Sequence, residues 1–381
     1  MSETLNVDTV IDRLYVKSRN RYETKTLIKK LEGLISCTFT FRNYTKEYIQ
    51  ERLQKLEQFQ KQLNVLTKLP ILEQRSQEWY DIRQNLITAS DFAQALGDGK
   101  FGTQKQFFQK KCGYEKDTFD NNMPALKWGI KYEPIAIDAY AAKNKVKMYE
   151  FGLLIHPQPN MKWFGASPDA ISELGIMVEI KCPWRRVITG EVPKQYYYQI
   201  QGQLDVCCLQ ECDFLECEFI EYSNAEEFQR HCDDNENEKG VIIEYFGKDN
   251  QTKYVYSPFE YNRDYQRISQ WEQETRSKLN QSITITKTYY WQLHTFSVVR
   301  VYKDDNFLKE KFTQLKLVWD KINEYKMNKT LYDQEIVCTK SKSMMIDTNI
   351  DPIVTTKQPK NGFKDVKLNG WAFVSDDDEE D

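Results

Sequence analysis

The chain has little histidine: only His156, His231 and His294 occur among its 381 residues. These three lie far apart and match no helical metal motif, so histidine-based catalytic triads and histidine-rich zinc sites have little material. Long apolar runs are also lacking, because none approaches the roughly 18 residues of a membrane span. The start of the chain, MSETLNVDTV, has neither the basic nor the apolar segment of a signal peptide. We therefore expect an intracellular protein that is not secreted and has no membrane partner.

A disulfide framework is not indicated either. The nine cysteines are irregularly spaced in a long chain, which is typical of reduced thiols. Hydrophobic residues make up 40% of the chain and aromatic residues 13%, so a sizeable core can form and global disorder is excluded. The length suggests about two domains.

Net charge alone does not point to a nucleic-acid partner, because it is −4. The last six residues, Asp376 to Asp381, are all acidic, and without them 53 basic residues face 51 acidic ones. Residues 1–70 hold 13 Lys and Arg against 8 Asp and Glu. This basic part either contacts nucleic-acid phosphates or forms a solvated helical surface.

Apolar periodicity divides the chain into three parts. It predicts helices over 8–35 and 44–66, and Leu69-Pro70 then interrupts the pattern. We therefore predict a helical N-terminal extension over 1–70. A main domain over 71–345 follows, with a core at 72–220 and a C-terminal elaboration at 221–345. Residues 346–381 are polar and acidic and are predicted to be disordered.

The main domain alternates between helix and strand signals. Helices are predicted over 90–97, 103–112 and 194–208, and another is predicted to open at Glu133-Pro134, where proline suits a first helical turn. Strands are predicted over 151–156, 162–171, 176–182 and 213–221. Farther on, strands are predicted near 240–246, 252–257 and 284–302, with helices at 261–279 and 304–326. This mixture predicts an α/β (α+β) fold with a central mixed sheet flanked by helices.

One stretch, GASPDAISELGIMVEIKCPW from Gly165 to Trp184, places charges where a buried strand is expected. Glu173-Leu174-Gly175 is a turn signal, and a hairpin centred on Leu174 sets Asp169 opposite Glu179. Opposed residues hold their Cβ atoms roughly 4.5–5.5 Å apart. Lys181 shares a strand face with Glu179, because side chains alternate along a strand.

Two chemistries fit this hairpin. Close carboxylates repel each other, and a divalent cation such as Mg²⁺ would remove that repulsion with the Ile180 carbonyl as a further oxygen ligand. Lys181 would then lie beside the metal, as in metal-assisted phosphodiester hydrolysis. The alternative is a cross-strand ion pair of Lys181 with Asp169 or Glu179 at a sheet edge. Spacing alone does not decide between them.

The surrounding motifs resemble a known nuclease family. Ser167-Pro168-Asp169, nine intervening residues and Glu179-Ile180-Lys181 resemble the PD-(D/E)XK signature, which is loose by itself. In chain order the sequence also contains Trp79-x-x-x-Arg83-x-x-x-Ile87-Thr88-Ala89-Ser90, Trp128-Gly129-x-x-Tyr132-Glu133, Glu179-x-Lys181-Cys182-Pro183 and Gln199-Ile200-Gln201. This series resembles the YqaJ/lambda-exonuclease branch, the phage and viral alkaline exonucleases used in recombination. The resemblance covers about 72–220, and the long N-terminal extension suggests a relative from a large DNA virus.

The resemblance implies a role for each matched residue. Asp169, Glu179 and the Ile180 backbone carbonyl would hold Mg²⁺, for which Mn²⁺ is expected to substitute, and Lys181 would assist the attacking water. Glu133 matches the family's helix carboxylate near a second metal position. The positions that would contact substrate phosphates are Arg83, Ser90, Ser167 and Gln199.

Each of these residues also has a purely structural interpretation. Arg83 could pair with a surface carboxylate, and Ser90 could cap a helix over 91–97. Glu133 could favour a helix N-terminus, and Gln199 could be a polar residue on a helix face. Trp79 is assigned to core packing, and at least one of Tyr196, Tyr197 and Tyr198 should face the core. Ala170 departs from the family's glycine, which suggests that the chain stays extended after Asp169.

The resulting expectation is a metal-dependent deoxyribonuclease for recombination, replication or repair, acting as a 5′-to-3′ exonuclease on linear double-stranded DNA ends. A PD-(D/E)XK endonuclease of structure-specific or restriction type is the alternative, followed by a non-catalytic DNA-binding scaffold. RNA cleavage stays open, because nothing identifies a reader of the 2′-hydroxyl. An iron–sulfur cluster on Cys112, Cys208, Cys212 and Cys217 is not favoured, because the spacing is loose and buried cysteines are usually core residues.

Partners follow from the same resemblance. A single-strand annealing protein fits the recombination role, and some family members form homo-oligomeric rings around DNA. The segment Gly370 to Val374 with its six following acids is either a docking peptide or a solubilising end. The host cytoplasm, where viral replication occurs, or the nucleus is the expected location.

Overall fold

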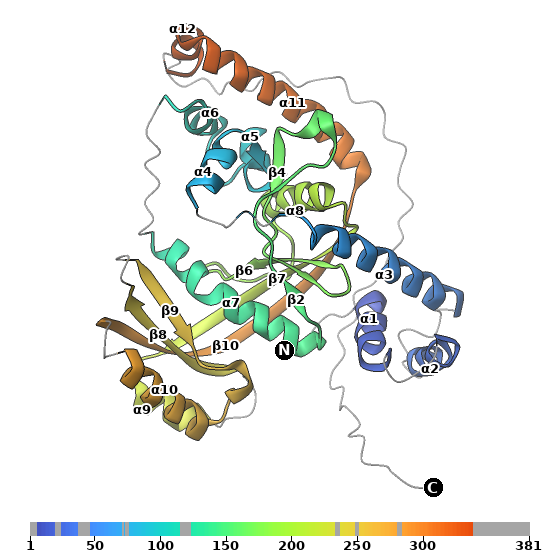
Figure 1. Ribbon diagram of the computed structural model, residues 1–381, viewed down its shortest axis with the longest axis vertical. Coiled ribbons are helices and arrows are strands. Elements are labelled where there is room, and N and C mark those ends of the chain that lie inside the picture. The colour runs from blue at the N-terminus through green and yellow to red at the C-terminus, as the bar shows by residue number, and fades with distance from the viewer. Residues whose placement is uncertain are drawn as a thin grey trace. The chain divides into compact units, whose positions relative to one another are not determined.

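The computed structural model describes residues 6–19, 24–36, 46–70, 72, 76–114, 123–232, 237–247, 251–279 and 284–337. They belong to two compact units (Figure 1), of which one contains the chain up to Gln58 and the other begins at Phe59. Helix α3 (Lys46–Leu66) contributes to both units. The division at 70 and 345 stays a prediction, and the acidic tail 346–381 lies outside the described residues.

The N-terminal unit contains α1 (Val7–Ser18) and α2 (Thr24–Ser36) together with the first half of α3. The single helix predicted over 8–35 is therefore wrong. Helix α1 ends where the Arg19 N–H bonds the Tyr15 carbonyl at 2.8 Å. Within the unit, the buried Arg52 guanidinium donates to both carboxylate oxygens of Asp12 at 2.8 and 2.7 Å, which joins α3 to α1.

The second unit begins with short helices and one long helix. These are α4 (Gln77–Gln84), the 3-10 turn η2 (Ala89–Asp91), α5 (Phe92–Ala95), α6 (Gln104–Cys112) and α7 (Pro124–Asn144). The prediction that a helix opens at Glu133-Pro134 is wrong, because α7 opens at Pro124 and Pro134 lies inside it. Packing compensates for the hydrogen bond that Pro134 lacks, since its neighbours Tyr132 and Ala136 are fully buried.

Two mixed sheets form the second unit. The smaller has the order β1-β4-β3, and its strands are β1 (Ile87–Thr88), β3 (Leu154–Ile155) and β4 (Phe164–Ala166). The larger has seven strands in the order β2-β5-β6-β7-β10-β8-β9. These are β2 (Met148–Tyr149), β5 (Ala170–Ser172), β6 (Met177–Lys181), β7 (Glu211–Tyr222), β8 (Lys239–Phe246), β9 (Thr252–Tyr256) and β10 (Thr284–Tyr302). Strands β6 and β7 are parallel, and every other neighbour in the larger sheet is antiparallel.

Opposite faces of the larger sheet carry α7 and α8 (Lys194–Cys207). On the α7 side, the Tyr132 ring stacks on Phe219 at 4.4 Å. On the α8 side, the Tyr196 ring lies 5.6 Å from Phe214, which occupies the other face of β7 because side chains alternate. The predicted central mixed sheet flanked by helices is confirmed.

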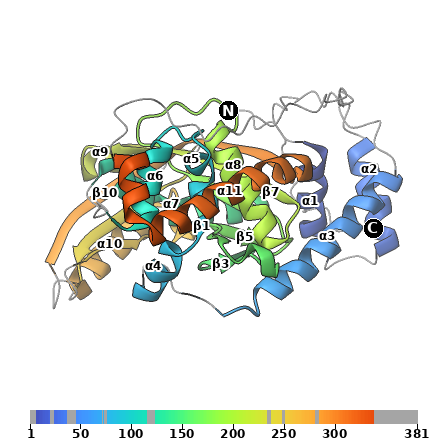
Figure 2. The ribbon, with the colours of Figure 1, turned by 90° about the horizontal axis from the view of Figure 1, so that it is seen from above.

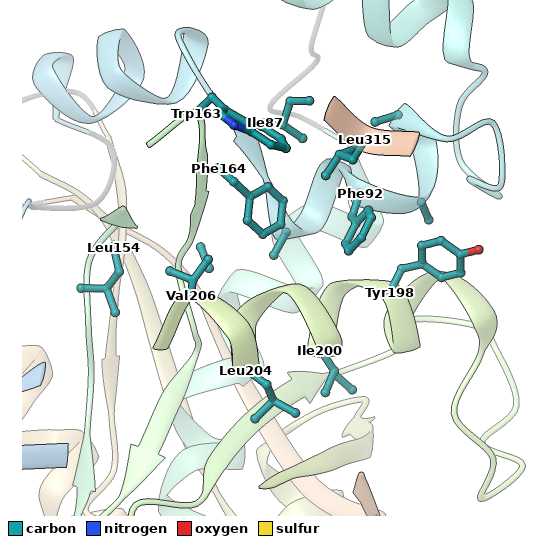
Figure 3. Packing of buried hydrophobic residues seen from close by; sticks show 14 of the residues in the cluster. Ile87, Phe92, Leu154, Trp163, Phe164, Tyr198, Ile200, Leu204, Val206 and Leu315 are labelled. Atoms are coloured by element: carbon teal, nitrogen blue, oxygen red, sulfur yellow. The ribbon is translucent and has the colours of Figure 1, made fainter. Parts of the chain in front are cut away.

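The main core lies on both sides of α8. Tyr198 and Val206 pack closely toward Phe164 of β4 in the smaller sheet, whereas Ile200 and Leu204 point from the opposite side of the helix (Figure 3). Gly202 allows this close approach, because a Cβ there would lie 2.9 Å from Phe164 Cζ and 3.1 Å from Ala89 Cβ. As expected of the three consecutive tyrosines, at least one faces the core.

The C-terminal elaboration extends the larger sheet. Helices α9 (Ala225–Cys232) and α10 (Tyr265–Leu279) pack on β8 and β10 (Figures 1 and 2) around a small core that includes Phe228 and Ile268. Helix α11 (Asp305–Met327) returns to the main core, followed by α12 (Lys329–Tyr332) and a π-helical turn (Asp333–Val337). Across the described ranges, every helix is too short or too polar to cross a lipid bilayer.

Candidate active site

The predicted hairpin has the predicted register. Ala170 pairs with Val178 and Ile171 with Met177, so Leu174 is the centre and Asp169 is the next residue opposite Glu179. The single strand predicted over 162–171 is nevertheless wrong. The chain bends over Ser167–Asp169, leaving β4 in the smaller sheet and β5 in the larger one. Asp169 therefore lies in a bend, and the extended chain predicted from Ala170 begins only after the carboxylate.

The hairpin turn contacts the second half of α3. Gly175 has a φ of +75°, and a Cβ at this position would lie 2.3 Å from the Phe59 carbonyl oxygen. Both the left-handed backbone and the close approach require glycine here. The turn that sets the register is thus held against a helix from the N-terminal part of the chain.

Asp169 directly precedes β5, and its side chain bonds the part of β6 that extends beyond the pairing with β5. Its Oδ2 accepts the Ile180 N–H at 2.7 Å. In an extended strand the N–H and C=O of one residue point to the same edge. The Ile180 carbonyl therefore faces the edge where Asp169 lies, beyond the last backbone pair of β5. Two of the three oxygen ligands that the sequence predicted, Asp169 and the Ile180 carbonyl, therefore lie on the same side of β6, and the charge of the third, Glu179, acts on Asp169.

Glu179 is fully buried and has donors on both oxygens. Lys181 Nζ donates to Oε1, and Gln203 Nε2 donates to Oε2 at 2.8 Å. The predicted alternative was a cross-strand ion pair at a sheet edge. The observed pair of Lys181 and Glu179 lies instead within one strand, in the part of β6 that pairs with β7 but extends beyond its pairing with β5. Lys181 Nζ also lies 5.1 Å from the centre of the Tyr196 ring.

Negative charge is concentrated in this cluster, because the Asp169 and Glu179 carboxyl groups lie close together. Burial, and then the neighbouring Glu179, raise the pKa of Asp169 well above its usual range, against the opposing effect of Lys181. Burial acts to lower the pKa of Lys181, but Glu179 and Asp169 outweigh it and raise that pKa. A buried pair of carboxylates with one ammonium is short of positive charge, which a divalent cation would supply.

Glu133 approaches this cluster from α7, on the other face of the sheet. Burial is the main cause that raises the pKa of Asp169 and of Cys182, and the charge of Glu133 adds to both, so Glu133 lies within electrostatic range of the bend. Glu133 is in the interior of α7, so its interpretation as a residue favouring a helix N-terminus is wrong. Among the described residues, no three His, Cys, Asp or Glu side chains gather as a metal cluster. The part of Glu133 in metal binding stays a prediction.

Arg83 and Ser90 are in contact. Arg83 Nη2 donates to Ser90 Oγ at 3.0 Å, and the guanidinium carbon lies 4.8 Å from the centre of the Trp79 ring. Trp79, predicted in the core, is half-buried beneath Arg83 instead. Ser90 is not a helix cap, because Thr88 and Asp91 form the capping box of this turn. The Ser90 hydroxyl is thus left at the surface beside a cation.

A buried ion pair fixes this second group of residues. Lys111 Nζ lies 3.0 Å from Asp91 Oδ2 and donates to the backbone carbonyls of Leu86 and Arg83 at 2.8 and 3.0 Å. Burial acts to raise the pKa of Asp91, but Lys111, Lys110 and Arg83 outweigh it and lower that pKa well below its usual range. Burial lowers the pKa of Lys111, and Asp91 offsets this only in part. Both side chains of this ion pair are buried away from water, so each charge needs the other to compensate it.

The segment that contains Ser90 and the segment that leads to Asp169 both leave the smaller sheet at the carboxyl ends of its parallel strands. Strands β1 and β4 are parallel, with Thr88 paired to Gly165. Ser90 and Ser167 each follow that pair by two residues, so both lie beyond the carboxyl ends of neighbouring strands. Ser167 Oγ is buried and has no hydrogen-bond partner within the described part of the chain, so it can donate to or accept from a ligand. Ser90 therefore lies beyond the strand next to that of Ser167, which precedes Asp169 by two residues; the phosphate contacts stay a prediction.

Helix α8 supplies a residue that the sequence analysis missed. Gln199 is half-buried on α8, and Gln203 lies one turn later on the same face, where it contacts Glu179. The spacing of four residues from Gln199 was the available signal. Gln201 instead bonds the Tyr302 carbonyl at 2.9 Å and the Asp304 N–H at 2.7 Å, so its role is structural.

The cysteines considered for an iron–sulfur cluster do not converge. Cys212 and Cys217 are an odd number of residues apart on β7, so they point to opposite faces of the sheet. Both are buried, as is Cys112 in the main core, whereas Cys208 is exposed. A cluster cannot bind Cys212 and Cys217 together in this fold.

Comparisons with known proteins agree with the motif series. Residues 78–210 match the family model of the YqaJ-like viral recombinase domain. A protein of Acanthamoeba polyphaga mimivirus, a large DNA virus, is 27% identical in an alignment 316 residues long that covers 72% of this chain. The chain spans 57% of the length of that relative.

Two solved structures are also similar. The alkaline exonuclease LHK-Exo from Laribacter hongkongensis aligns over 68% of this chain and 100% of its own, with 18% identity and a TM-score of 0.42. A phage-related exonuclease from Haemophilus somnus aligns over 63% of this chain and 93% of its own, with 10% identity and a TM-score of 0.34. Over residues 78–210 the chain is therefore similar to the YqaJ-like viral recombinase domain, the family that its motifs resemble.

Proposed function

We propose that the protein is a Mg²⁺-dependent exonuclease that degrades linear double-stranded DNA from its 5′ ends. The observation that carries this proposal is the pairing of Asp169 with Glu179 beside Lys181, within a YqaJ-like domain. The nearby Arg83–Ser90 contact supports it, because it offers a second site for phosphate beside the first.

The residues fit a divalent cation. Asp169, Glu179 and the Ile180 carbonyl are hard oxygen donors of the kind that Mg²⁺ prefers, and burial together with the charge of Glu179 raises the pKa of Asp169. When bound there, Mg²⁺ or Mn²⁺ would polarise the scissile phosphate and make water a better nucleophile. Glu133 is proposed to contribute a further carboxylate from α7.

The protein's own residues then have separate tasks. Lys181 orients the attacking water, because its ammonium lies on the strand face of Glu179. Arg83 and Ser90 bind the terminal phosphate, the guanidinium by two parallel N–H donors and the hydroxyl by one. Ser167 and Gln199 add neutral polar contacts to the phosphate next to the cleaved bond.

One assay separates this proposal from its alternatives. The protein is incubated with Mg²⁺ and either linear or covalently closed circular duplex DNA, with Lys181→Ala as the inactive control. Degradation of linear DNA alone supports an exonuclease, whereas cutting of the closed circle supports an endonuclease. If the wild-type protein leaves both substrates intact, a non-catalytic scaffold is the better account.

The wider context of the activity is also a proposal. We place the protein in recombination and repair inside the infected host cell, in the cytoplasm or the nucleus. A single-strand annealing protein would take over the strand that a 5′-to-3′ exonuclease exposes. Mass photometry with and without DNA tests whether copies of the chain assemble around the duplex.

A further inference from the structure

Gln203 makes the most specific contact to the proposed metal site that the family motifs leave out. Its side chain is only 1% exposed, and its amide Nε2 donates to Glu179 Oε2 at 2.8 Å. The same nitrogen lies 3.4 Å from the Ser167 carbonyl. Its Oε1 is buried and has no hydrogen-bond partner among the described residues.

Glu179 fixes the orientation of this amide. A carboxylate only accepts hydrogen bonds, so a reversed amide would set Gln203 Oε1 against a negatively charged oxygen. The observed orientation satisfies Glu179 but leaves the amide oxygen without a donor. A buried acceptor without a donor is unfavourable, so the contact to Glu179 must be favourable enough to offset this loss.

The two donors on Glu179 differ in how easily they can leave. The Lys181 side chain is 23% exposed and can move its ammonium toward solvent. Gln203 is enclosed on a helix that Gly202 holds tightly against the main core. A divalent cation can therefore replace Lys181 at Oε1, while Gln203 keeps its hold on Oε2.

We propose that Gln203 is a positioning residue that orients Glu179 for divalent metal by holding one carboxylate oxygen and leaving the other for the cation. This inference rests on the proposed function. The inference goes beyond the proposed function, because it assigns a role in metal affinity to a residue outside the matched motifs. Loss of a hydrogen bond that orients a metal ligand typically lowers metal affinity about 10–100-fold.

The test measures Mn²⁺ binding to the DNA-free, full-length protein by electron paramagnetic resonance. Gln203→Met keeps the length of the side chain but removes the donor, and it should weaken binding about 10–100-fold. Cleavage of linear duplex should then require more Mn²⁺ and recover at saturating Mn²⁺. A merely structural role would lower the rate at every metal concentration. Gln203→Leu removes the same donor with a different shape and gives a second measurement if the first variant fails to fold.

Gln201→Met is the matched control, because it also removes a buried glutamine from α8. It loses the contacts to Tyr302 and Asp304, so it should unfold more easily yet bind Mn²⁺ as tightly as the wild type. Folded Gln203 variants that bind Mn²⁺ within twofold of the wild type would overturn the inference. If the wild type still binds Mn²⁺ and degrades linear DNA, only the role of Gln203 fails. If the wild type does neither, the proposed function fails with it.

Discussion

Replacing one helical glycine by alanine tests how α8 is held against the core. A Cβ at Gly202 would meet Phe164, Ala89 and Phe92 at 2.9–3.1 Å, whereas a Cβ at Gly129 in α7 would meet nothing within 4 Å. Alanine favours a helix interior over glycine by roughly 1 kcal/mol at either position. Overpacking at 202 costs about 1–3 kcal/mol. Gly129→Ala should therefore stabilise the protein, while Gly202→Ala should range from neutral to about 2 kcal/mol less stable.

The measurement is chemical denaturation of both variants beside the wild type, followed by Mg²⁺ titration of cleavage. Because the propensity gain is common to both, the difference between their unfolding free energies is the overpacking cost at α8. Gly202→Ala should also raise the Mg²⁺ requirement, since α8 carries Gln199 and Gln203. Equal stabilisation by the two substitutions would refute the tight packing of α8 that positions these residues.

Three further substitutions test the site. Lys181→Ala should reduce cleavage of linear duplex by about 100-fold or more, as expected for a lost proton-transfer or water-orienting group; activity near the wild type would contradict its role. Arg83→Lys should reduce the preference for 5′-phosphate over 5′-hydroxyl ends, because it removes a bidentate fork, and an unchanged ratio of rates would argue against that contact. Lys111→Met should cost about 3–5 kcal/mol of stability at neutral pH by removing the nearest ammonium from the buried Asp91, which keeps the more distant Lys110 at 3.8 Å as an ion-pair partner. Since the pKa of Asp91 is lowered in the folded protein, the stability from this pair is present at neutral pH and is lost as pH falls below about 4. The gap between wild type and Lys111→Met in urea midpoints should therefore narrow below pH 4, and a constant gap would count against the ion pair.

Local patterns predicted the elements of the hairpin well. Alternation and the turn at Leu174 were enough to set Asp169 opposite Glu179, because both signals come from neighbouring residues. They could not show that the chain bends at Ser167–Asp169. That bend exists because β4 and β5 pair with strands of different sheets, which is a long-range property.

Helix boundaries show the same limit. Two prolines ten residues apart, Pro124 and Pro134, are both acceptable as the first residue of a helix. The rule selected Pro134, but burial of Tyr132 and Ala136 on the sheet makes the longer helix favourable. The position of Glu133 changed with the boundary, from the N-terminus of a helix to its interior, while its role in metal binding stays a prediction.

Two buried contacts around the site could not be predicted from local sequence patterns, because each joins residues that are distant in the chain. Gln203 contacts a carboxylate 24 positions earlier in the chain, and Lys111 contacts Asp91 from another helix. Neither pair follows a local period, so only the fold reveals it. Arg83 and Ser90, by contrast, lie within one local segment, so a motif can single out both, although it did not predict their contact with each other.

The most direct test of the proposed exonuclease compares linear with covalently closed circular duplex of the same sequence in the presence of Mg²⁺. The proposal predicts that the wild type degrades the linear form, faster from 5′-phosphorylated than from 5′-hydroxyl ends, and leaves the closed circle intact. Lys181→Ala should degrade neither form. Cutting of the closed circle by the wild type, or no cleavage of either form, would contradict the proposal.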